Sequence, residues 1–377
     1  MPSRVVICRS NPVAPDPCVE KIARALARNG WEVTVLAWGY HDADPLTEER
    51  EGYRIQRIRL ARPVRRGLGN LPGLARWQIA QGVWLLRHIA AFDILHACDF
   101  DTLLPALCAR RLAGKRVVYD IFDFYADMLT RTPRWMVRGL RRMELAAIGQ
   151  ADAVILADDA RRAQIAGARP RRLEVVYNSP EESGAAGMDM QRPVFAQGGL
   201  RIAYTGNLQR ERGLFELLDV LQRHPDWHLD LAGFGPDTGE IAARASGMTN
   251  VTWHDLVPYA RALELNARAD VLVATYDPAV LNHRFSSPNK VFEAMLLARP
   301  IVVAQNTNAD RLVEDAGCGL AIPYGSENHL EQALIRLAGD AALRASLGRS
   351  GRKAYERTYH WAHMERRLVD LYRALES

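Results

Sequence analysis

The apolar residues of this chain fall into two alternating patterns. Residues 5–8 form a short run that is apolar throughout, whereas over residues 19–29 the apolar positions recur every three or four residues until Gly30. The first pattern is typical of a strand buried on both faces, and the second of an amphipathic helix with a glycine stop. Strands of this kind belong to parallel sheets covered by helices, so the pattern predicts an α/β fold.

The alternation continues in two series along the chain. The first series predicts strands at residues 5–8, 32–37, 94–97, 116–120, 153–156 and 174–176, with helices over 19–29 and 103–112. The second series predicts strands at residues 202–205, 229–232, 251–253, 271–274 and 301–304, with helices over 214–221 and 291–297. Two series predict two parallel-sheet domains, and such sheets bind ligands beyond the carboxyl ends of their strands.

Residues 179–197 separate the two series. They are rich in Ser, Pro, Gly, Ala and acidic residues and show no apolar period, which is typical of an interdomain linker. We therefore predict an N-terminal domain over residues 1–180, a linker over 181–198, a second domain over 199–358 and a C-terminal helix over 359–377. With 377 residues the chain is long enough for two cores. We expect the C-terminal helix to pack back on the N-terminal domain.

Composition limits the location of the protein. Hydrophobic residues make up 48% of the chain and charged residues 25%, as in soluble globular proteins. The five cysteines are dispersed without a CxxC pair or a metal-ligand spacing, which fits a reducing cytosol. No run of about 18 uncharged apolar residues occurs, and Arg9 interrupts the first apolar run before a signal-peptide core could form. We expect a cytoplasmic protein, either free or docked at the inner face of the plasma membrane.

The net charge of +5 is concentrated in the first half of the chain. Two basic segments there also carry tryptophan, and basic faces with aromatic anchors suit an anionic membrane surface. A solvated arginine-rich face is the alternative interpretation. Nucleic acid is not expected as a partner, because no stacking module or DNA-reading motif is present. The residues assigned to the membrane-facing or acceptor side are Trp77, Trp135, Arg138 and Arg141.

Residues 286–295 read as a loop that starts a helix and directs its first turn at an anion. Ser287 is a suitable N-cap, and Pro288 fits the first helical position. The free N–H groups at a helix start favour a phosphate, and Lys290 adds a positive charge in the same turn. Glu293 follows close enough to accept hydrogen bonds from a ribose. A nucleoside diphosphate matches these features, although an ordinary capped helix with a surface lysine is the alternative.

Two glycine turns follow strands of the second series. Gly206 and Asn207 come after the strand at 202–205, and Gly233 and Gly235 come after the strand at 229–232. Glycine lets the backbone approach a ligand closely, so these turns are compatible with a phosphate or nucleotide at the same rim.

The chain resembles the GT-B fold glycosyltransferases, specifically the retaining family 4, over nearly its whole length. The resemblance lies in three segments: Asp16-Pro17-Cys18-Val19, Tyr204-Thr205-Gly206-Asn207-Leu208 through Arg212-Gly213, and Ser287-Pro288-Asn289-Lys290-Val291-Phe292-Glu293. It implies two facing Rossmann-like domains, an acceptor side and a donor side, with a cleft between them. Phe285 stands where the family has a first glutamate, and Phe122 stands where it has a histidine.

The resemblance implies roles for residues of the donor side. Arg212 and Lys290 would hold the diphosphate and neutralise charge on the leaving group, which removes the need for a metal ion or another cofactor. Glu293 would accept from the ribose hydroxyls. The other donor-binding residues implied are Gly206, Asn207, Gly233, Gly235, Ser286, Ser287, Pro288 and Asn289.

The acceptor side follows the predicted strand at 116–120. Asp120 and Asp123 lie at its end, and a carboxylate there could position the acceptor hydroxyl or act as a general base. If Asp123 is a base, the reaction could invert the anomeric carbon. Alternatively, either aspartate caps the next helix or pairs with a basic neighbour. His96 ends an apolar strand and is expected to be a hydrogen-bonded core residue.

These features together predict a metal-independent hexosyltransferase. Its expected substrates are a nucleotide-sugar donor and a lipid-linked saccharide acceptor, as in the assembly of a bacterial polysaccharide. Two alternatives stay open at this stage. A nucleotide-sugar epimerase also uses two facing parallel-sheet domains, and a relative without catalysis is suggested by the missing histidine and glutamate at positions 122 and 285.

Overall fold

The computed structural model describes residues 3–40, 42–61, 71–129, 132–182 and 199–376. Most of the predicted linker and the basic residues Arg62, Arg65, Arg66 and Arg131 therefore lie outside the described residues. The chain divides into two compact units, one formed by Met1–Tyr177 with Met364–Ser377 and the other by Asn178–His363. Residues from Met364 onward thus group with the N-terminal unit.

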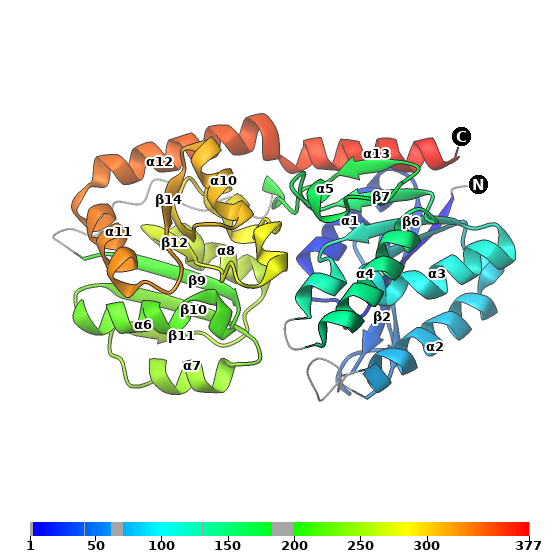
Figure 1. Ribbon diagram of the computed structural model, residues 1–377, viewed down its shortest axis with the longest axis horizontal. Coiled ribbons are helices and arrows are strands. Elements are labelled where there is room, and N and C mark those ends of the chain that lie inside the picture. Colours follow the sequence, from blue (N-terminus) through cyan, green and yellow to red (C-terminus); the bar gives the residue numbers. More distant parts are fainter. Residues whose placement is uncertain (1–2, 41, 62–70, 130–131, 183–198, 377) are drawn as a thin grey trace. The chain divides into compact units, whose positions relative to one another are not determined.

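The N-terminal unit is built on an eight-stranded sheet with the order β3-β4-β2-β1-β5-β6-β7-β8 (Figure 1). All neighbouring strands pair in parallel except β3 and β4, which pair antiparallel at one edge. The strands are β1 Arg4–Arg9, β2 Glu32–Gly39, β3 Thr47–Arg50, β4 Tyr53–Arg59, β5 Ile94–Cys98, β6 Arg116–Ile121, β7 Ala153–Leu156 and β8 Leu173–Val175. The crossovers change direction between β1 and β5, which is the position where open α/β sheets bind ligands.

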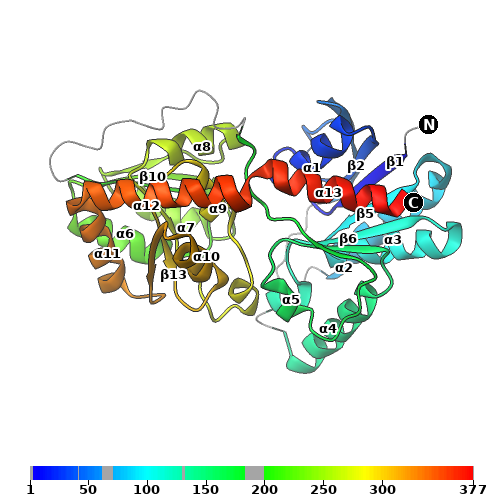
Figure 2. The ribbon, with the colours of Figure 1, turned by 90° about the horizontal axis from the view of Figure 1, so that it is seen from above.

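Helices cover both faces of this sheet. They are α1 Pro17–Arg28, α2 Leu71–Arg87, α3 Phe100–Ala113, α4 Arg134–Ile148, α5 Arg161–Gln164 and α13 Trp361–Glu376. Strand β5 shows which helix lies on which face, because its side chains alternate. Leu95 and Ala97 belong to the core that includes residues of α2, α3 and α4, whereas His96 points to the other face and contacts Tyr372 of α13. Figure 2 shows α13 lying along its face of the sheet, near α1.

The second unit has a six-stranded parallel sheet with the order β11-β10-β9-β12-β13-β14. Its strands are β9 Arg201–Asn207, β10 His228–Phe234, β11 Val251–Trp253, β12 Val271–Ala274, β13 Ile301–Ala304 and β14 Gly319–Ile322. Its main helices are α6 Leu214–Arg223, α7 Thr238–Ala245, α8 Tyr259–Arg268, α9 Asn289–Leu296, α10 Asn308–Ala316, α11 Glu327–Gly339 and α12 Ala341–Ala354. The crossovers change direction between β9 and β12.

The structure confirms the predicted parallel strands, most of them to within two residues at each end. Strands β3, β4 and β14 and the helices α2, α4, α5, α7, α8 and α10 were not predicted. Among the described residues, no helix is both long and apolar enough to cross a membrane.

Candidate active site

The carboxyl edge of the second unit's sheet brings two cations together. Lys290 lies at the start of α9, and its ammonium is 4.1 Å from the centre of the Tyr204 ring. Arg212 precedes α6, and its guanidinium is 3.7 Å from the centre of the Tyr276 ring, which follows β12. Each cation therefore rests on an aromatic face at the point where the crossovers change direction.

Neither cation makes an ion pair with a residue that the structure describes. The Nε and Nη1 atoms of Arg212 are buried and have no hydrogen-bond partner there. Lys290 is only 6% exposed. A buried cation without a contacting ion-pair partner leaves donors unsatisfied, so this arrangement is suited to receive an anion.

The charge state of Lys290 follows from its neighbours. Burial alone would lower the pKa of its ammonium, but the nearby Tyr204, Tyr276 and Glu293 outweigh that effect and leave the pKa raised. Lys290 therefore stays protonated over the physiological range, even though Arg212 opposes it.

Two glycines allow the close approach at this edge. A Cβ atom on Gly206 would lie 2.8 Å from Nζ of Lys290, and one on Gly233 would lie 1.8 Å from the carbonyl oxygen of Gly206. Their φ angles of +141° and +145° are also rare for residues with a side chain. The other predicted turn residues, Asn207 and Gly235, lie beside them, since a Cβ on Gly235 would meet Oδ1 of Asn207 at 2.6 Å.

The start of α9 differs from the prediction. Ser287 is not the N-cap, and Pro288 is not the first helical residue: Pro288 is itself the N-cap, with extended backbone, and α9 begins at Asn289. The Pro288 carbonyl accepts the first helical hydrogen bond, from the Val291 amide at 2.9 Å. Ser286 donates to the carbonyl of His283 at 3.3 Å.

Glu293 is buried on α9, and a hydrogen bond fixes its carboxylate. Nδ2 of Asn266 donates to its Oε2 at 3.0 Å, and the same amide contacts Oγ1 of Thr205. These hydrogen bonds connect β9, α8 and α9. A ribose acceptor role for Glu293 stays a prediction.

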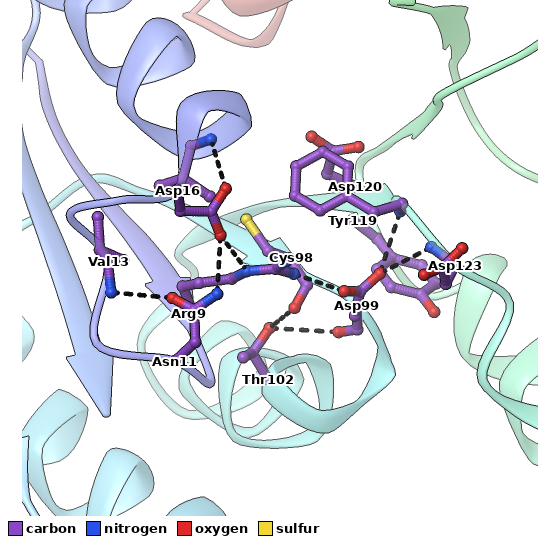
Figure 3. A network of polar contacts seen from close by, with 12 residues as sticks. Arg9, Asn11, Val13, Asp16, Cys98, Asp99, Thr102, Tyr119, Asp120 and Asp123 are labelled. Carbon is purple, nitrogen blue, oxygen red and sulfur yellow. Dashed lines mark hydrogen bonds and ion pairs between the residues drawn. The ribbon is translucent and has the colours of Figure 1, made fainter. Parts of the chain in front are cut away.

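A second polar network lies at the corresponding edge of the N-terminal unit, where β1 and β5 end (Figure 3). The Arg9 guanidinium bridges two carboxylates, with Nε donating to Asp16 at 2.9 Å and Nη1 to Asp99 at 2.5 Å. Asn11 also donates to Asp16 at 2.8 Å. The loops after β1 and β5 are thereby joined.

Asp99 extends this network to the loop after β6. Its Oδ1 accepts from the amides of Phe122 and Asp123 at 3.1 and 3.0 Å. The Asp99 backbone has φ +64° and ψ 169°, a strained combination for a residue with a side chain. Strain of this kind persists where the surroundings fix it, so Asp99 is a candidate for positioning the 122–123 loop.

The two predicted acceptor-side aspartates have different surroundings. Asp123 is half-exposed and accepts from Nη2 of the buried Arg161 at 3.1 Å, which is the alternative of pairing with a basic neighbour. Asp120 was assigned to the acceptor side or to a membrane face. It is 1% exposed, so a membrane-facing position is wrong, and an acceptor-side role stays a prediction. Its Oδ2 contacts Nε2 of His96 at 3.1 Å, and Nδ1 of His96 contacts Tyr372 at 2.8 Å. His96 is thus a hydrogen-bonded core residue, as predicted.

The residues assigned to a membrane surface differ in their exposure. Trp77 is buried and stacks on Trp38 with ring centres 5.6 Å apart, so its assignment to the surface is wrong. Arg141 is half-buried, and its guanidinium donates to Asp127 at 2.7 Å and to the Gln164 carbonyl at 2.6 Å. Trp135 and Arg138 are exposed on α4.

Two carboxyl groups of the N-terminal unit, the half-buried Asp99 and the buried Glu144, predict a pH-dependent stability. Burial, with repulsion from Asp123 and Asp101, raises the pKa of Asp99 to about 7 against the attraction of Arg9. Burial likewise raises the pKa of Glu144 to about 7, against its hydrogen bonds. Unfolded carboxyl groups titrate near pH ~4, so between about pH 4 and 7 the folded protein holds protons that the unfolded chain lacks.

We therefore expect the free energy of unfolding to rise as the pH falls through this window, by up to about 1.4 kcal/mol per pH unit for each proton held. Urea unfolding at pH values between about 5 and 8 measures this slope. Glu144→Gln removes one of the two groups and should make the slope shallower, whereas the surface change Glu51→Gln should leave it unchanged. Equal slopes for all three proteins would contradict the assignment.

Comparison with known families agrees with this geometry. Residues 18–179 match the family model described as Glycosyltransferase Family 4, and residues 199–340 match the model described as Glycosyl transferases group 1. The two models together span most of the chain. The chain belongs to the family 4, group 1 glycosyltransferases. It is accordingly a nucleotide-sugar-dependent glycosyltransferase, as the resemblance of its motifs predicted.

Two curated relatives share moderate identity with the enzyme. The alpha-maltose-1-phosphate synthase of Mycolicibacterium smegmatis is 27% identical over 62% of this chain and 66% of its own length, slightly under two thirds. The GDP-mannose:cellobiosyl-diphosphopolyprenol alpha-mannosyltransferase of Xanthomonas campestris is 24% identical over 80% of this chain and 79% of its own length.

Solved structures show that the fold is GT-B. Sucrose-phosphate synthase of Thermosynechococcus elongatus superposes with a TM-score of 0.77 at 16% identity, covering 99% of each chain. The Anabaena protein HepE, solved in complex with UDP and glucose, gives 0.73 at 16% identity and covers 99% of this chain and 100% of its own. The predicted α/β class with two parallel-sheet domains is therefore confirmed.

Sequence reasoning did not identify several residues of these sites. Tyr276 supports Arg212, and Arg9 and Asp99 form the network of the N-terminal unit. Tyr204 was quoted only as part of a motif, yet its ring supports Lys290. The available signal was their position at or near strand ends, since ligand-binding residues of such sheets lie there: Arg9 ends β1, Asp99 follows β5 and Tyr276 follows β12.

Proposed function

We propose that this enzyme transfers a hexosyl unit from a nucleoside diphosphate sugar to a hydroxyl group of a lipid-linked saccharide. The transfer retains the anomeric configuration, needs no metal ion, and serves the assembly of a bacterial polysaccharide or similar glycan. The enzyme works in the cytoplasm, at the inner face of the plasma membrane.

The observation that supports this proposal is the pair of cations at the β9–β12 edge that make no ion pair with a described residue. A diphosphate carries the charge that Arg212 and Lys290 lack. A guanidinium offers two parallel donors to phosphate oxygens, and an ammonium offers a point charge. Two fixed cations in this place supply the charge that a divalent metal ion would otherwise provide.

The proposed step breaks the bond between the anomeric carbon and the diphosphate oxygen and forms a bond from that carbon to the acceptor oxygen. Negative charge develops on the leaving diphosphate, where Arg212 and Lys290 stabilise it more in the transition state than in the ground state. With retention, the acceptor approaches from the side of the leaving group, so the acceptor proton passes to a phosphate oxygen. Asp123, which pairs with Arg161, then needs no role as a base.

The proposed acceptor class draws on one relative. The Xanthomonas campestris enzyme is named for a diphosphopolyprenol acceptor, and it matches 80% of this chain. The solved structure of HepE holds UDP and glucose, which supports a uridine or similar nucleotide as the donor carrier. A lipid-linked acceptor requires that the enzyme reach a membrane surface.

A thermal-shift screen tests the donor proposal. A nucleoside diphosphate present at about 100 times its dissociation constant stabilises the folded state by about 2.7 kcal/mol. For a unit of this size that corresponds to an increase in Tm of roughly 5–10 °C. The increase should persist in EDTA. If no nucleoside diphosphate or nucleotide sugar raises Tm, the proposed donor site is wrong.

A further inference from the structure

Helix α2 carries an apolar stripe that nothing in the described part of the N-terminal unit covers. Ile79, Val83 and Leu86 are 68%, 41% and 49% exposed. Their spacing of four and then three residues places them on one face of the helix.

The opposite face of α2 is apolar as well. Trp77 and Leu85 are buried in the core of the unit, and between them Gln81 donates to the Thr102 carbonyl at 2.9 Å. An amphipathic surface helix shows a polar outer face, whereas a helix that is apolar all round is normally covered on every side. Among the described residues, helix α2 therefore has no covering partner on its outer face.

Helix α4 adds a second exposed apolar group on the same layer. Trp135 is 73% exposed and Met143 is 55% exposed, and their spacing of eight residues also places them on one face. Helices α2, α3 and α4 cover the same face of the eight-stranded sheet, and α3 packs against both of its neighbours (Figure 1). We call the outer side of these three helices the α2–α4 surface.

The charge of the α2–α4 surface is positive and uncompensated. Helix α2 has no acidic residue, and the single acid of α4, Glu144, is buried. Exposed arginines of these two helices make no ion pair within the described ranges; they are Arg76, Arg87, Arg134, Arg138 and Arg142.

Exposed arginines elsewhere in the described ranges include paired and unpaired ones. Arg54 contacts Glu49 at 2.5 Å, and Arg223 contacts Glu331 at 3.0 Å. Arg311 and Arg336 make no ion pair within the described ranges. What distinguishes α2 and α4 is that their unpaired arginines lie on the same two helices as the exposed apolar side chains, where they are available to external anions.

We propose that the α2–α4 surface docks on an anionic lipid bilayer, with the apolar stripe of α2 and Trp135 of α4 entering the headgroup boundary. Apolar area buried in the boundary and arginines facing anionic headgroups are the two contributions that hold an interfacial helix. Long arginine side chains reach the headgroups while their stems stay among apolar groups. This inference rests on the proposed lipid-linked acceptor and names the surface that brings the enzyme to it.

Vesicle flotation of the full chain tests the proposal. Vesicles of pure phosphatidylcholine are compared with vesicles of phosphatidylcholine and phosphatidylglycerol in equal parts. We expect the wild type to float with the anionic vesicles and to be released by salt. The affinity of the double variant Ile79→Ser, Leu86→Ser for these vesicles should be at least about tenfold lower, because two aliphatic side chains no longer enter the boundary. Arg138→Gln and Arg142→Gln should each weaken binding about fivefold.

Ile335→Ser is the matched control, because Ile335 is 49% exposed on α11 of the other unit. It should bind like the wild type, and Tm should be unchanged in all variants, since the substituted side chains are exposed. The proposal is overturned if the wild type ignores anionic vesicles, or if Ile79→Ser, Leu86→Ser and Ile335→Ser bind alike. It is also overturned if the wild type sediments as a dimer and the double variant as a monomer, because a second copy of the chain would then cover the stripe.

The outcome separates this inference from the proposed donor chemistry. A wild type that fails to bind vesicles but gains stability with a nucleoside diphosphate refutes the surface and leaves the donor site standing. A wild type that binds vesicles without a response to any nucleotide supports the surface and refutes the donor site.

Discussion

Arg212→Ala and Lys290→Ala should each lower kcat/KM by about 100- to 1,000-fold. The reason is that each side chain supplies preorganised charge to the leaving diphosphate, and loss of one such donor costs rate on this scale. The double variant should lose less than the product of the single losses, because the two cations act on one group. Release of nucleoside diphosphate from a nucleotide sugar measures the rate, and the ligand-induced increase in Tm measures binding.

Arg210→Ala is the matched control. Arg210 lies two residues before Arg212, but it is exposed and pairs with Glu240 at 2.7 Å, so its removal should leave turnover nearly unchanged.

Lys290→Met should keep or increase the Tm of the ligand-free protein, since it removes a buried charge that has no ion-pair partner in the described structure. Near-normal turnover of both alanine variants would show that these cations do not bind the diphosphate.

Gly233→Ala should destabilise the second unit by about 2–5 kcal/mol. A Cβ atom at this position would lie 1.8 Å from the Gly206 carbonyl oxygen, directly across the β9–β10 pair. A φ angle of +145° adds strain for any residue with a side chain. Overpacking and backbone strain of this kind each cost about 1–3 kcal/mol. Urea unfolding followed by intrinsic fluorescence measures the loss.

Gly239→Ala provides the comparison within the same unit. Gly239 lies in α7, and a Cβ atom there would meet no atom within 4 Å. Alanine is the better helix former, so this variant should be as stable as the wild type or more stable by up to about 1 kcal/mol. If Gly233→Ala unfolds at the same urea concentration as Gly239→Ala, the strands at this edge adapt more easily than the geometry indicates.

Continuous apolar strands made most of the fold predictable from the sequence. Strand β4 was missed because arginines interrupt its apolar pattern. The inward-facing Arg57 of this strand is 4% exposed, and its guanidinium donates to the Pro12 carbonyl at 2.8 Å and to Glu48 at 2.8 Å. A buried arginine is acceptable only with such partners, and these partners become visible only once the chain is folded.

The predicted donor site residues Arg212, Lys290 and Glu293 do lie near one another, because a local motif and two strand ends were enough to place them. Residues that complete the sites through distant contacts were not predictable in this way. Asp99 meets Arg9 from 90 positions away in the sequence, and nothing local marks the pair.

The assignment of Trp77 to the surface was wrong for a related reason. A tryptophan among arginines on an apolar helix fits a surface anchor and a core residue equally well in sequence. Its stacking on Trp38 of β2 shows which face of α2 turns inward. The same contact identifies Ile79, Val83 and Leu86 as the outer stripe.

The tail of α13 sets an order for folding during synthesis. Tyr372 supplies a hydrogen bond to the buried His96 of β5, and Trp31 packs edge-to-face against the same tyrosine with ring centres 5.5 Å apart. The ribosome makes these partners at opposite ends of the message. The second unit can complete its sheet while the last codons are still being read, whereas the unit that starts first must wait for the end of translation to acquire its final helix.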